Sequence, residues 1–311
     1  MSRSSSLDTP GVSRLDLGAV SVFFGDKNGK YPDGNQVVVR GADTLVVFDS
    51  PLVANRIGEV FDAADLCILG HAHEDHITGL HRIPGAEVHV HERDVEAVRT
   101  WEGLSVHYGY PPEVLASMRT KIEKEFHYHP RPDAIAYGND KQWSLGGGVT
   151  VRAIHMPGHT SGHCVLLVEP AGVAFIGDID LSSFGPYYGD GTSSLAEFRQ
   201  TLRTVADIPA RAWVTSHHKG AVTDREEFER ALAAFAARID ARTDKLVGML
   251  QEGPKSLDTL VRERLIYPPG HGELWVDCVE ARTLLQHLDE LVAQGRVQAR
   301  EDGRYALVRG H

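Results

Sequence analysis

The sequence predicts an α+β protein with two parts, a larger one in which helices cover β-sheets and a smaller helical one at the C-terminal end. Short runs of β-branched residues recur through the first 215 of the 311 residues and alternate with helical segments. From about residue 225 the pattern changes to long runs of good helix formers. The composition, with 42% hydrophobic and 24% charged residues, is that of an ordinary globular protein.

Strands are predicted where short apolar runs are bounded by turn residues. In the first half they are expected at 17–23, 36–40, 44–49, 66–69 and 88–90. Helices are expected at 54–64 and over 92–126, with a break at Tyr110-Pro111-Pro112 because proline disrupts a helix interior. In the second half, strands are expected at 149–155, 164–168, 173–176 and 211–215, and a helix at 195–206.

The C-terminal part is predicted to hold three helices followed by a hairpin. One long helix covers 224–251, and Ser256 is the expected N-cap of a second, short helix. A third runs over 278–294 with leucines at helical spacing, and Gly295 ends it. Two short strands around a Gly-containing turn follow, which is the pattern of a winged helix. We therefore predict a catalytic domain over 1–235 and a winged-helix-like domain over 236–311.

The charge distribution weighs against nucleic acid as a partner. The chain holds 32 Lys+Arg and 43 Asp+Glu, a formal net charge of −11. Residues 241–311 hold 10 Lys+Arg and 11 Asp+Glu, and the helix over 278–294 has Arg282 as its one Lys or Arg. A nucleic-acid-binding winged helix would present a basic recognition helix. We expect the C-terminal part to serve in docking or dimerisation instead. The expected substrate is a small molecule, and a homodimer is an open alternative.

The sequence carries no sign of export or of a membrane span. Its first twenty residues lack the apolar core of a secretory signal. No apolar run approaches the roughly 18 residues that a transmembrane helix needs. The three cysteines, Cys67, Cys164 and Cys278, lie far apart and form no CxxC pair. We expect a soluble cytoplasmic protein.

Histidine is abundant, with 17 residues, and its densest motif predicts a metal site. His71-Ala72-His73-Glu74-Asp75-His76 has the pattern HxHxDH and follows the apolar strand ending at Leu69. Imidazole and carboxylate groups are the ligands that zinc, iron and manganese prefer. A tight loop after a strand directs alternate side chains to different places, so this motif can supply ligands to two neighbouring ions.

Three further signals follow along the chain. Pro157-Gly158-His159-Thr160-Ser161-Gly162-His163 places His159 at a tight turn, whereas His163 and His155 are expected to be structural or outer-sphere histidines. A strand ends in Gly177-Asp178. Another ends in Ser216-His217-His218, where strand alternation favours His217 but leaves His218 open. Pro269-Gly270-His271 lies too far along the chain, so His271 is expected to be a loop histidine.

The order and spacing of HxHxDH, PGHTxGH, strand-Gly-Asp and strand-His over residues 15–235 resemble the metallo-β-lactamase superfamily. The C-terminal part is similar to the winged-helix end of its β-lactamase-like protein 2 branch. The resemblance implies a four-layer αββα sandwich with a binuclear metal centre. By motif match, His71, His73 and His159 would hold one ion, Asp75, His76 and His217 a second, and Asp178 would bridge them.

The resemblance also implies the chemistry. A hydroxide between two ions, with Zn²⁺ first and iron or manganese as alternatives, would be the nucleophile. Asp75 and Asp178 would therefore be catalytic as well as metal ligands, and Asp49 would support the ligands from outside. The sequence departs from the family in reading Ser-His-His in place of Gly-His at the last motif. It also has no cysteine at a ligand position, which disfavours the β-lactamases that use one.

Aromatic residues near these motifs are candidates for the substrate pocket. A Gly/Pro/aromatic loop follows Asp178, and Tyr188 or Tyr187 in it is a candidate donor to the oxyanion, with packing as an equal alternative. The insertion over 92–130 is a candidate lid, and core packing explains its aromatic residues equally well. The function predicted is a binuclear metallohydrolase acting on an ester-type carbonyl, in a thioester, a lactone or a related small molecule. The alternatives are an endoribonuclease or phosphodiesterase and an iron-dependent sulfur dioxygenase.

Overall fold

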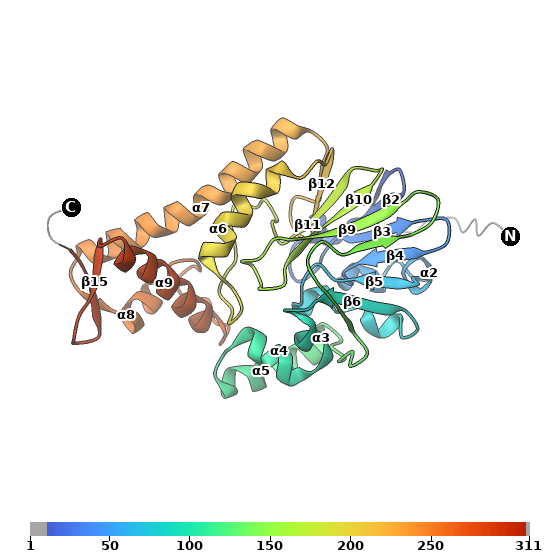
Figure 1. The fold of residues 1–311 in the computed structure, drawn as a ribbon. Coiled ribbons are helices and arrows are strands. Elements are labelled where there is room, and N and C mark those ends of the chain that lie inside the picture. The colour runs from blue at the N-terminus through green and yellow to red at the C-terminus, as the bar shows by residue number, and fades with distance from the viewer. Residues whose placement is uncertain (1–10, 309–311) are drawn as a thin grey trace.

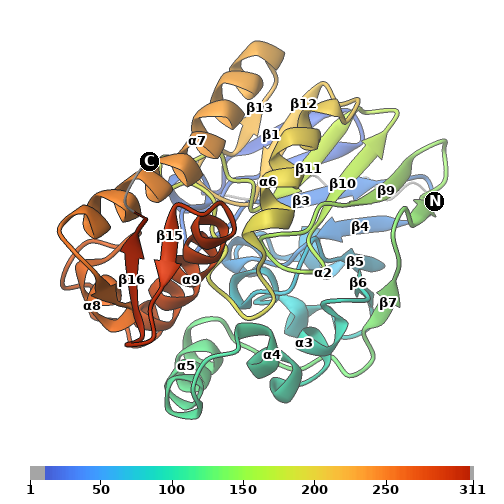
Figure 2. The ribbon, with the colours of Figure 1, turned by 60° about the vertical axis from the view of Figure 1, so that its left-hand side comes forward.

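The computed structural model describes residues 11–308. The first ten residues, where the predicted catalytic domain begins, and residues 309–311 lie outside the described part. Two β-sheets face each other between layers of helices, and a smaller unit lies at the C-terminal end (Figures 1 and 2). The predicted α+β class is therefore confirmed.

The first sheet has seven strands in sequence order. These are β1 (Arg14–Leu17), β2 (Val20–Phe23), β3 (Gln36–Arg40), β4 (Leu45–Phe48), β5 (Leu66–Ile68), β6 (Glu87–His91) and β7 (Ile135–Tyr137). The strands from β1 to β4 are antiparallel neighbours, and those from β4 to β7 are parallel. The run expected as one strand over 17–23 is instead a hairpin, because Gly18 has a φ of 68° and turns the chain.

The second sheet has six strands in the order β13-β12-β11-β10-β9-β8. These are β8 (Gln142–Ser144), β9 (Thr150–His155), β10 (Cys164–Glu169), β11 (Val173–Gly177), β12 (Ala212–Thr215) and β13 (Ala221–Val222). Only β11 and β12 are a parallel pair, so their carboxyl ends lie at the same edge. The sequence analysis missed β7, β8 and β13, which are two or three residues long.

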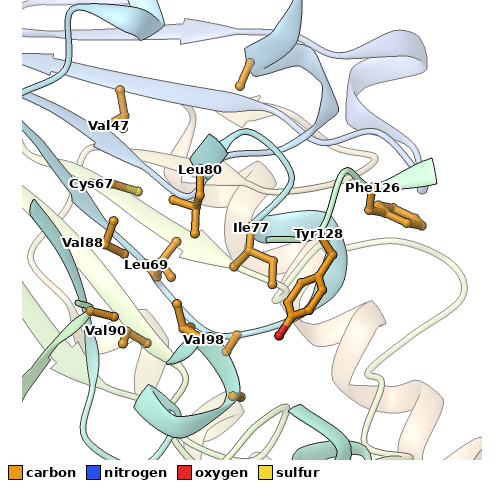
Figure 3. Close-up of a cluster of buried hydrophobic side chains, with 14 of the residues drawn as sticks. Val47, Cys67, Leu69, Ile77, Leu80, Val88, Val90, Val98, Phe126 and Tyr128 are labelled. Atoms are coloured by element: carbon orange, nitrogen blue, oxygen red, sulfur yellow. The ribbon is translucent and has the colours of Figure 1, made fainter. Parts of the chain in front are cut away.

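Three apolar clusters account for the four layers. One lies between the sheets and includes Val22, Phe48, Leu166 and Phe175. A second joins the first sheet to its helices, as Figure 3 shows for Val47, Leu69 and Val88. A third joins the second sheet to α6 and α7. Each sheet is thus covered on one face by the other sheet and on its opposite face by helices.

The helices on the side of the first sheet come from four segments of the chain. They are α1 (Asp26–Gly29), η1 (Leu52–Asn55), α2 (Glu59–Asp62), η2 (Glu74–His76), η3 (Leu80–Arg82), α3 (Val95–Arg99), α4 (Trp101–Tyr108) and α5 (Pro112–Glu125). The helix expected over 54–64 is two short pieces, because Gly58 has a φ of 57° between them. Proline begins α5, as the predicted break requires. On the second sheet lie α6 (Leu195–Thr204), η4 (Val205–Asp207) and the first half of α7.

The C-terminal unit is built on the second half of α7 (Arg225–Gln251). It adds β14 (Lys255–Ser256), α8 (Leu257–Glu263), α9 (Val276–Ala293), β15 (Val297–Ala299) and β16 (Arg304–Leu307). The Ser256 hydroxyl accepts a hydrogen bond from the Thr259 N–H and caps α8, as expected. The predicted boundary at 235/236 falls inside α7, whose buried residues pass from the catalytic core to the C-terminal core between Ile239 and Leu246. The winged-helix assignment and the boundary stay predictions.

A buried histidine links the two units and should make stability depend on pH. His287 of α9 contacts the Tyr188 hydroxyl at 2.8 Å through Nε2 and the Thr243 hydroxyl at 2.9 Å through Nδ1. Burial, followed by the charges of Arg242 and Arg199, lowers the pKa of His287 to about 3. Above the ordinary histidine pKa, the His287 side chain is neutral in both the folded and the unfolded protein. As pH falls below it, only the unfolded state gains the proton, which favours unfolding.

We therefore expect this group to lower the free energy of unfolding by up to about 1.4 kcal/mol per pH unit between roughly pH 6 and 4. Urea unfolding at a series of pH values should show a shallower dependence in His287→Gln than in the original protein. Equal slopes in the two proteins would contradict the assignment.

Candidate metal centre

The predicted ligand residues come from strand ends that meet at one edge of the two sheets. His71, His73, Asp75 and His76 follow β5, and His159 lies between β9 and β10. Asp178 directly follows β11, and His217 follows the neighbouring parallel strand β12. A Cβ at Gly177 would lie 2.5 Å from His163 Nε2, so glycine is required just before Asp178.

The first group contains His71, His73, His159 and Asp178, with one ligand atom of each within 4.8 Å of the others. His159 Nε2 lies 3.2 Å from His71 Nε2 and 3.0 Å from His73 Nδ1. Nitrogens bound to one tetrahedral zinc ion, each about 2.05 Å from it, are separated by about 3.3 Å. His159 therefore already has, toward both His71 and His73, the spacing that a shared ion would impose.

The second group contains Asp75, His76 and His217. His217 Nε2 lies 3.3 Å from His76 Nε2 and 3.1 Å from Asp75 Oδ2. His76 Nε2 lies 3.6 Å from Asp75 Oδ1. All three side chains are buried, so water cannot compensate their polar atoms.

The two oxygens of Asp178 face different groups. Oδ2 lies 3.3 Å from His159 Nε2, and Oδ1 lies 3.2 Å from His76 Nε2. Oδ1 is buried and has no hydrogen-bond partner in the described part of the chain. A buried carboxylate oxygen without a donor is costly unless a cation or a proton satisfies it. The donor set and this oxygen both fit metal ions.

The electrostatics of the cluster show an excess of negative charge. Burial alone would lower the pKa of a histidine. Nevertheless, the Asp178 and Asp75 carboxylates raise the pKa of His217 to about 10, and Asp190 raises that of His73 to about 9. Burial dominates at His159 and lowers its pKa to about 3. The same field that attracts protons to His217 and His73 would attract divalent cations.

Outer partners orient the ligand rings. The Asp49 carboxylate contacts His76 Nδ1 at 2.7 Å and accepts a hydrogen bond from the Gly70 N–H. His159 donates from Nδ1 to the Tyr187 carbonyl at 2.9 Å. His163 accepts the Asp178 N–H at Nε2 and donates from Nδ1 to the Met156 carbonyl. Because Nδ1 is occupied in both rings, the Nε2 atoms of His76 and His159 remain available to bind an ion.

Asp190 is a further partner that the sequence analysis missed. Its Oδ2 contacts His73 Nε2 at 2.8 Å, and its Oδ1 accepts hydrogen bonds from the Tyr110 hydroxyl and, at 3.0 Å, from the Tyr187 hydroxyl. The side chain is 1% exposed. Asp190 stands in the aromatic loop noted after Asp178, but no spacing rule connects it with His73, 117 residues earlier.

Tyrosines also surround Glu74 within the first motif. Its carboxylate accepts hydrogen bonds from the Tyr31 hydroxyl at 3.0 Å and from the Tyr108 hydroxyl. Of the candidate lid residues, Tyr108 stacks on His73 at 6.0 Å between ring centroids. Tyr108, Phe126 and Tyr128 all belong to the hydrophobic core under the first sheet, and Trp101 packs against it. The aromatic residues of the insertion therefore fill the core, and Tyr108 also borders the cluster.

Two sequence alternatives separate in the structure. His217 lies in the cluster, whereas His218 has a φ of 59° and a partly exposed side chain whose Nε2 is 3.9 Å from Asp180 Oδ2. Tyr188 is fully buried, with its hydroxyl on His287 of α9, so the structure gives it a structural role in place of the expected oxyanion contact. Tyr187 is the tyrosine beside the cluster, with its ring centroid 5.7 Å from that of His159.

The C-terminal unit contributes aromatic residues near the cluster. Tyr267 packs against the core of the catalytic part, and its ring centroid lies 5.8 Å from that of Phe184 and 5.7 Å from that of Trp275. Burial, then the nearby Asp190 and Glu280 carboxylates, raise the pKa of Tyr267. The buried Glu280 carboxylate accepts three backbone N–H groups, those of Leu265, Ile266 and Tyr267, and so fixes this loop. His271 stacks on Tyr267 at 5.2 Å, as a loop histidine.

Comparison with known proteins agrees with this architecture. A family model described as the metallo-beta-lactamase superfamily matches residues 32–239. The chain is 22% identical to a beta-lactamase-like protein 2 homolog of Drosophila melanogaster over 303 residues, covering 93% of this chain and 92% of the relative. It is 25% identical over 210 residues to an atrochrysone carboxyl ACP thioesterase of Pseudocercospora fijiensis, covering 65% of this chain and 59% of that relative.

Among solved structures, a metallo-beta-lactamase family protein from Thermus thermophilus superposes with a TM-score of 0.67 at 24% identity. The match covers 88% of this chain and 94% of that one, so the two share a fold. Within residues 11–308, no helix has the length and apolar character that crossing a membrane requires.

Proposed function

Because this chain belongs to the metallo-beta-lactamase superfamily and is a metallohydrolase, we propose that it hydrolyses an ester-type carbonyl, with a thioester as the preferred substrate. The observation that carries the proposal is the pair of ligand groups joined by Asp178. Histidine and carboxylate donors in two adjacent groups suit two Zn²⁺ ions, and iron or manganese accept the same donors. We assign His71, His73, His159 and Asp178 to one ion, and Asp75, His76, His217 and Asp178 to the other.

Ions bound there would polarise a carbonyl oxygen and lower the pKa of a nucleophilic water. Other residues of the chain orient the ligand histidines. Asp49, the Tyr187 carbonyl and Asp190 each hold the outer nitrogen of one ligand histidine. The Tyr187 ring lies beside those of His73 and His159, and its hydroxyl donates to Asp190, so Tyr187 supports the outer partner of His73.

The surroundings favour an acyl group over a polyanion. The Tyr267 ring contacts those of Phe184 and Trp275. Tyr187, whose ring lies beside that of His159, packs against the same core as Tyr267. We call these four residues the aromatic wall. Aromatic walls suit apolar or planar acyl groups. The net charge of −11 opposes a nucleic acid. A relative whose name states a thioesterase acting on an acyl carrier protein substrate supports the thioester over the lactone.

The test combines metal analysis with a substrate panel. Metal-loaded protein should hydrolyse aryl and long-chain acyl thioesters faster than acetyl thioesters, and chelation should abolish the activity. Tyr267→Ala should lower kcat/KM for the bulky acyl groups by about 10-fold relative to acetyl, the usual scale for a lost apolar contact. Tyr267→Phe keeps the ring and should behave like the original protein.

Other outcomes would overturn the assignment. Cleavage of RNA or a phosphodiester without thioesterase activity would identify a nuclease. Oxygen uptake with a persulfide by an iron-loaded preparation would identify a dioxygenase. We also propose that residues 236–311 form a winged-helix-like unit that supplies part of the aromatic wall, rather than a nucleic-acid-binding module.

A further inference from the structure

Three exposed histidines outside the metal centre lie together on the surface. His81 belongs to η3, and His127 and His129 follow α5. The ring centroid of His81 lies 5.5 Å from that of His127 and 5.8 Å from that of His129. None of the three has a part in the proposed hydrolysis. We propose that they form a second, separate binding site for a first-row divalent transition ion such as Zn²⁺.

Each of these histidines has a buried hydrophobic residue as its neighbour in the chain. Leu80, Phe126 and Tyr128 are buried in one hydrophobic cluster, as Figure 3 shows, and each is the chain neighbour of an exposed histidine. Phe126 and Tyr128 alternate with His127 and His129, so burial of the aromatic pair turns both histidines outward. The close approach of the three rings is therefore set by core packing that holds both segments.

Backbone hydrogen bonds prepare two of the rings as ligands. His81 Nδ1 lies 2.9 Å from the Thr78 carbonyl oxygen, and His129 Nδ1 lies 2.7 Å from the His127 carbonyl oxygen. A carbonyl oxygen only accepts, so Nδ1 carries the proton and Nε2 keeps its lone pair. Histidines that bind metals usually have their second nitrogen held in this way.

The spacing suits an ion after a small side-chain movement. Two imidazoles on one tetrahedral zinc ion have ring centroids about 5 Å apart, given Zn–N distances of about 2.05 Å. The observed 5.5 and 5.8 Å exceed this slightly, so the exposed rings need only a small shift to reach a common ion. Burial and then the neighbouring His127 and His129 lower the pKa of His81, which keeps it neutral for binding.

Such an ion would join two parts of the fold. One is the segment that follows HxHxDH, and the other is the end of the helical insertion. Because binding to the folded state alone stabilises it by mass action, the ion would fasten the insertion to the segment beside the metal centre. An exposed site of three histidines should be weaker than the buried centre, with micromolar affinity.

The experiment compares zinc binding in protein whose metal centre is already loaded. Isothermal titration with Zn²⁺ should detect one additional ion per chain at micromolar concentration, and metal analysis after equilibration should count it. The double variant His81→Ala/His129→Ala should lose that ion and keep its hydrolytic activity. His271→Ala removes another exposed loop histidine and should retain the ion.

Two results would overturn the proposal. One is the absence of an additional ion in the original protein, and the other is its retention in the double variant. Single His129→Gln, which replaces one exposed ring with a side chain of similar size, provides a second test. It should raise the zinc dissociation constant while leaving the unfolding temperature without added zinc unchanged.

Discussion

Asp178→Asn should abolish hydrolysis and remove metal from the protein. The amide keeps one oxygen, but it has no charge and its nitrogen cannot serve as a ligand. Either the group of His71, His73 and His159 or that of His76 and His217 therefore loses its shared carboxylate oxygen. Changing only the outer partners of metal ligands typically costs 10- to 100-fold, so the loss here should exceed about 100-fold. Metal content and kcat/KM on a thioester measure it.

The matched control is Asp180→Asn, two residues along the same loop. Asp180 is also largely buried, and burial raises its pKa to about 6. Its carboxylate accepts the Ser182 N–H at 2.9 Å and lies 3.9 Å from His218, outside both ligand groups. This variant should keep its metal and most of its activity. If Asp178→Asn retained the metal content and rate of the original protein, the proposed bridge would be wrong.

The central strands of both sheets could be predicted because both of their faces are buried. Runs such as Gln36–Arg40 and Cys164–Glu169 are apolar over most of their length and contain β-branched valines, which is a strong local signal. Strands β7 and β8 gave no such signal, since their outer residues are exposed. Gly18 and Gly58 have positive φ angles and each divides a segment that was predicted as a single element. The periodicity of apolar residues does not reveal such a division.

The residues of the candidate site could be predicted where they belong to a short sequence motif. HxHxDH, His159 and Asp178 each follow a strand or a tight turn, and the sheets bring these strand ends together. The choice between His217 and His218 depended on how the chain turns after β12. Tyr187 and Tyr188 lie in an irregular loop, where neighbouring side chains take directions that no period describes. Tyr267 reaches the site through packing of the C-terminal unit, for which the sequence offers no rule.

Asp190→Asn should weaken metal binding at the first group even though it changes no ligand. His73 faces His159 and the predicted ion through Nδ1, so its proton must lie on Nε2, which points at Asp190 Oδ2. The Tyr110 and Tyr187 hydroxyls donate to the other oxygen, Oδ1. In the variant these donors would hold the amide oxygen and turn the amide N–H₂ toward His73. Nε2 would then have to accept, and the proton would move to Nδ1, where the ion binds.

The expected loss is about 10- to 100-fold in metal affinity, the scale typical of an outer partner of a metal-bound histidine. Competition with a chelator of known affinity measures it, together with kcat/KM at saturating metal. Tyr187→Phe removes one of the two donors but leaves the Asp190 charge and the His73 tautomer intact, so its metal affinity should fall much less. Because both changes are nearly isosteric, unfolding temperatures that match the original protein would separate lost positioning from lost folding. Equal metal affinity in Asp190→Asn and the original protein would show that Asp190 does not set the tautomer of His73.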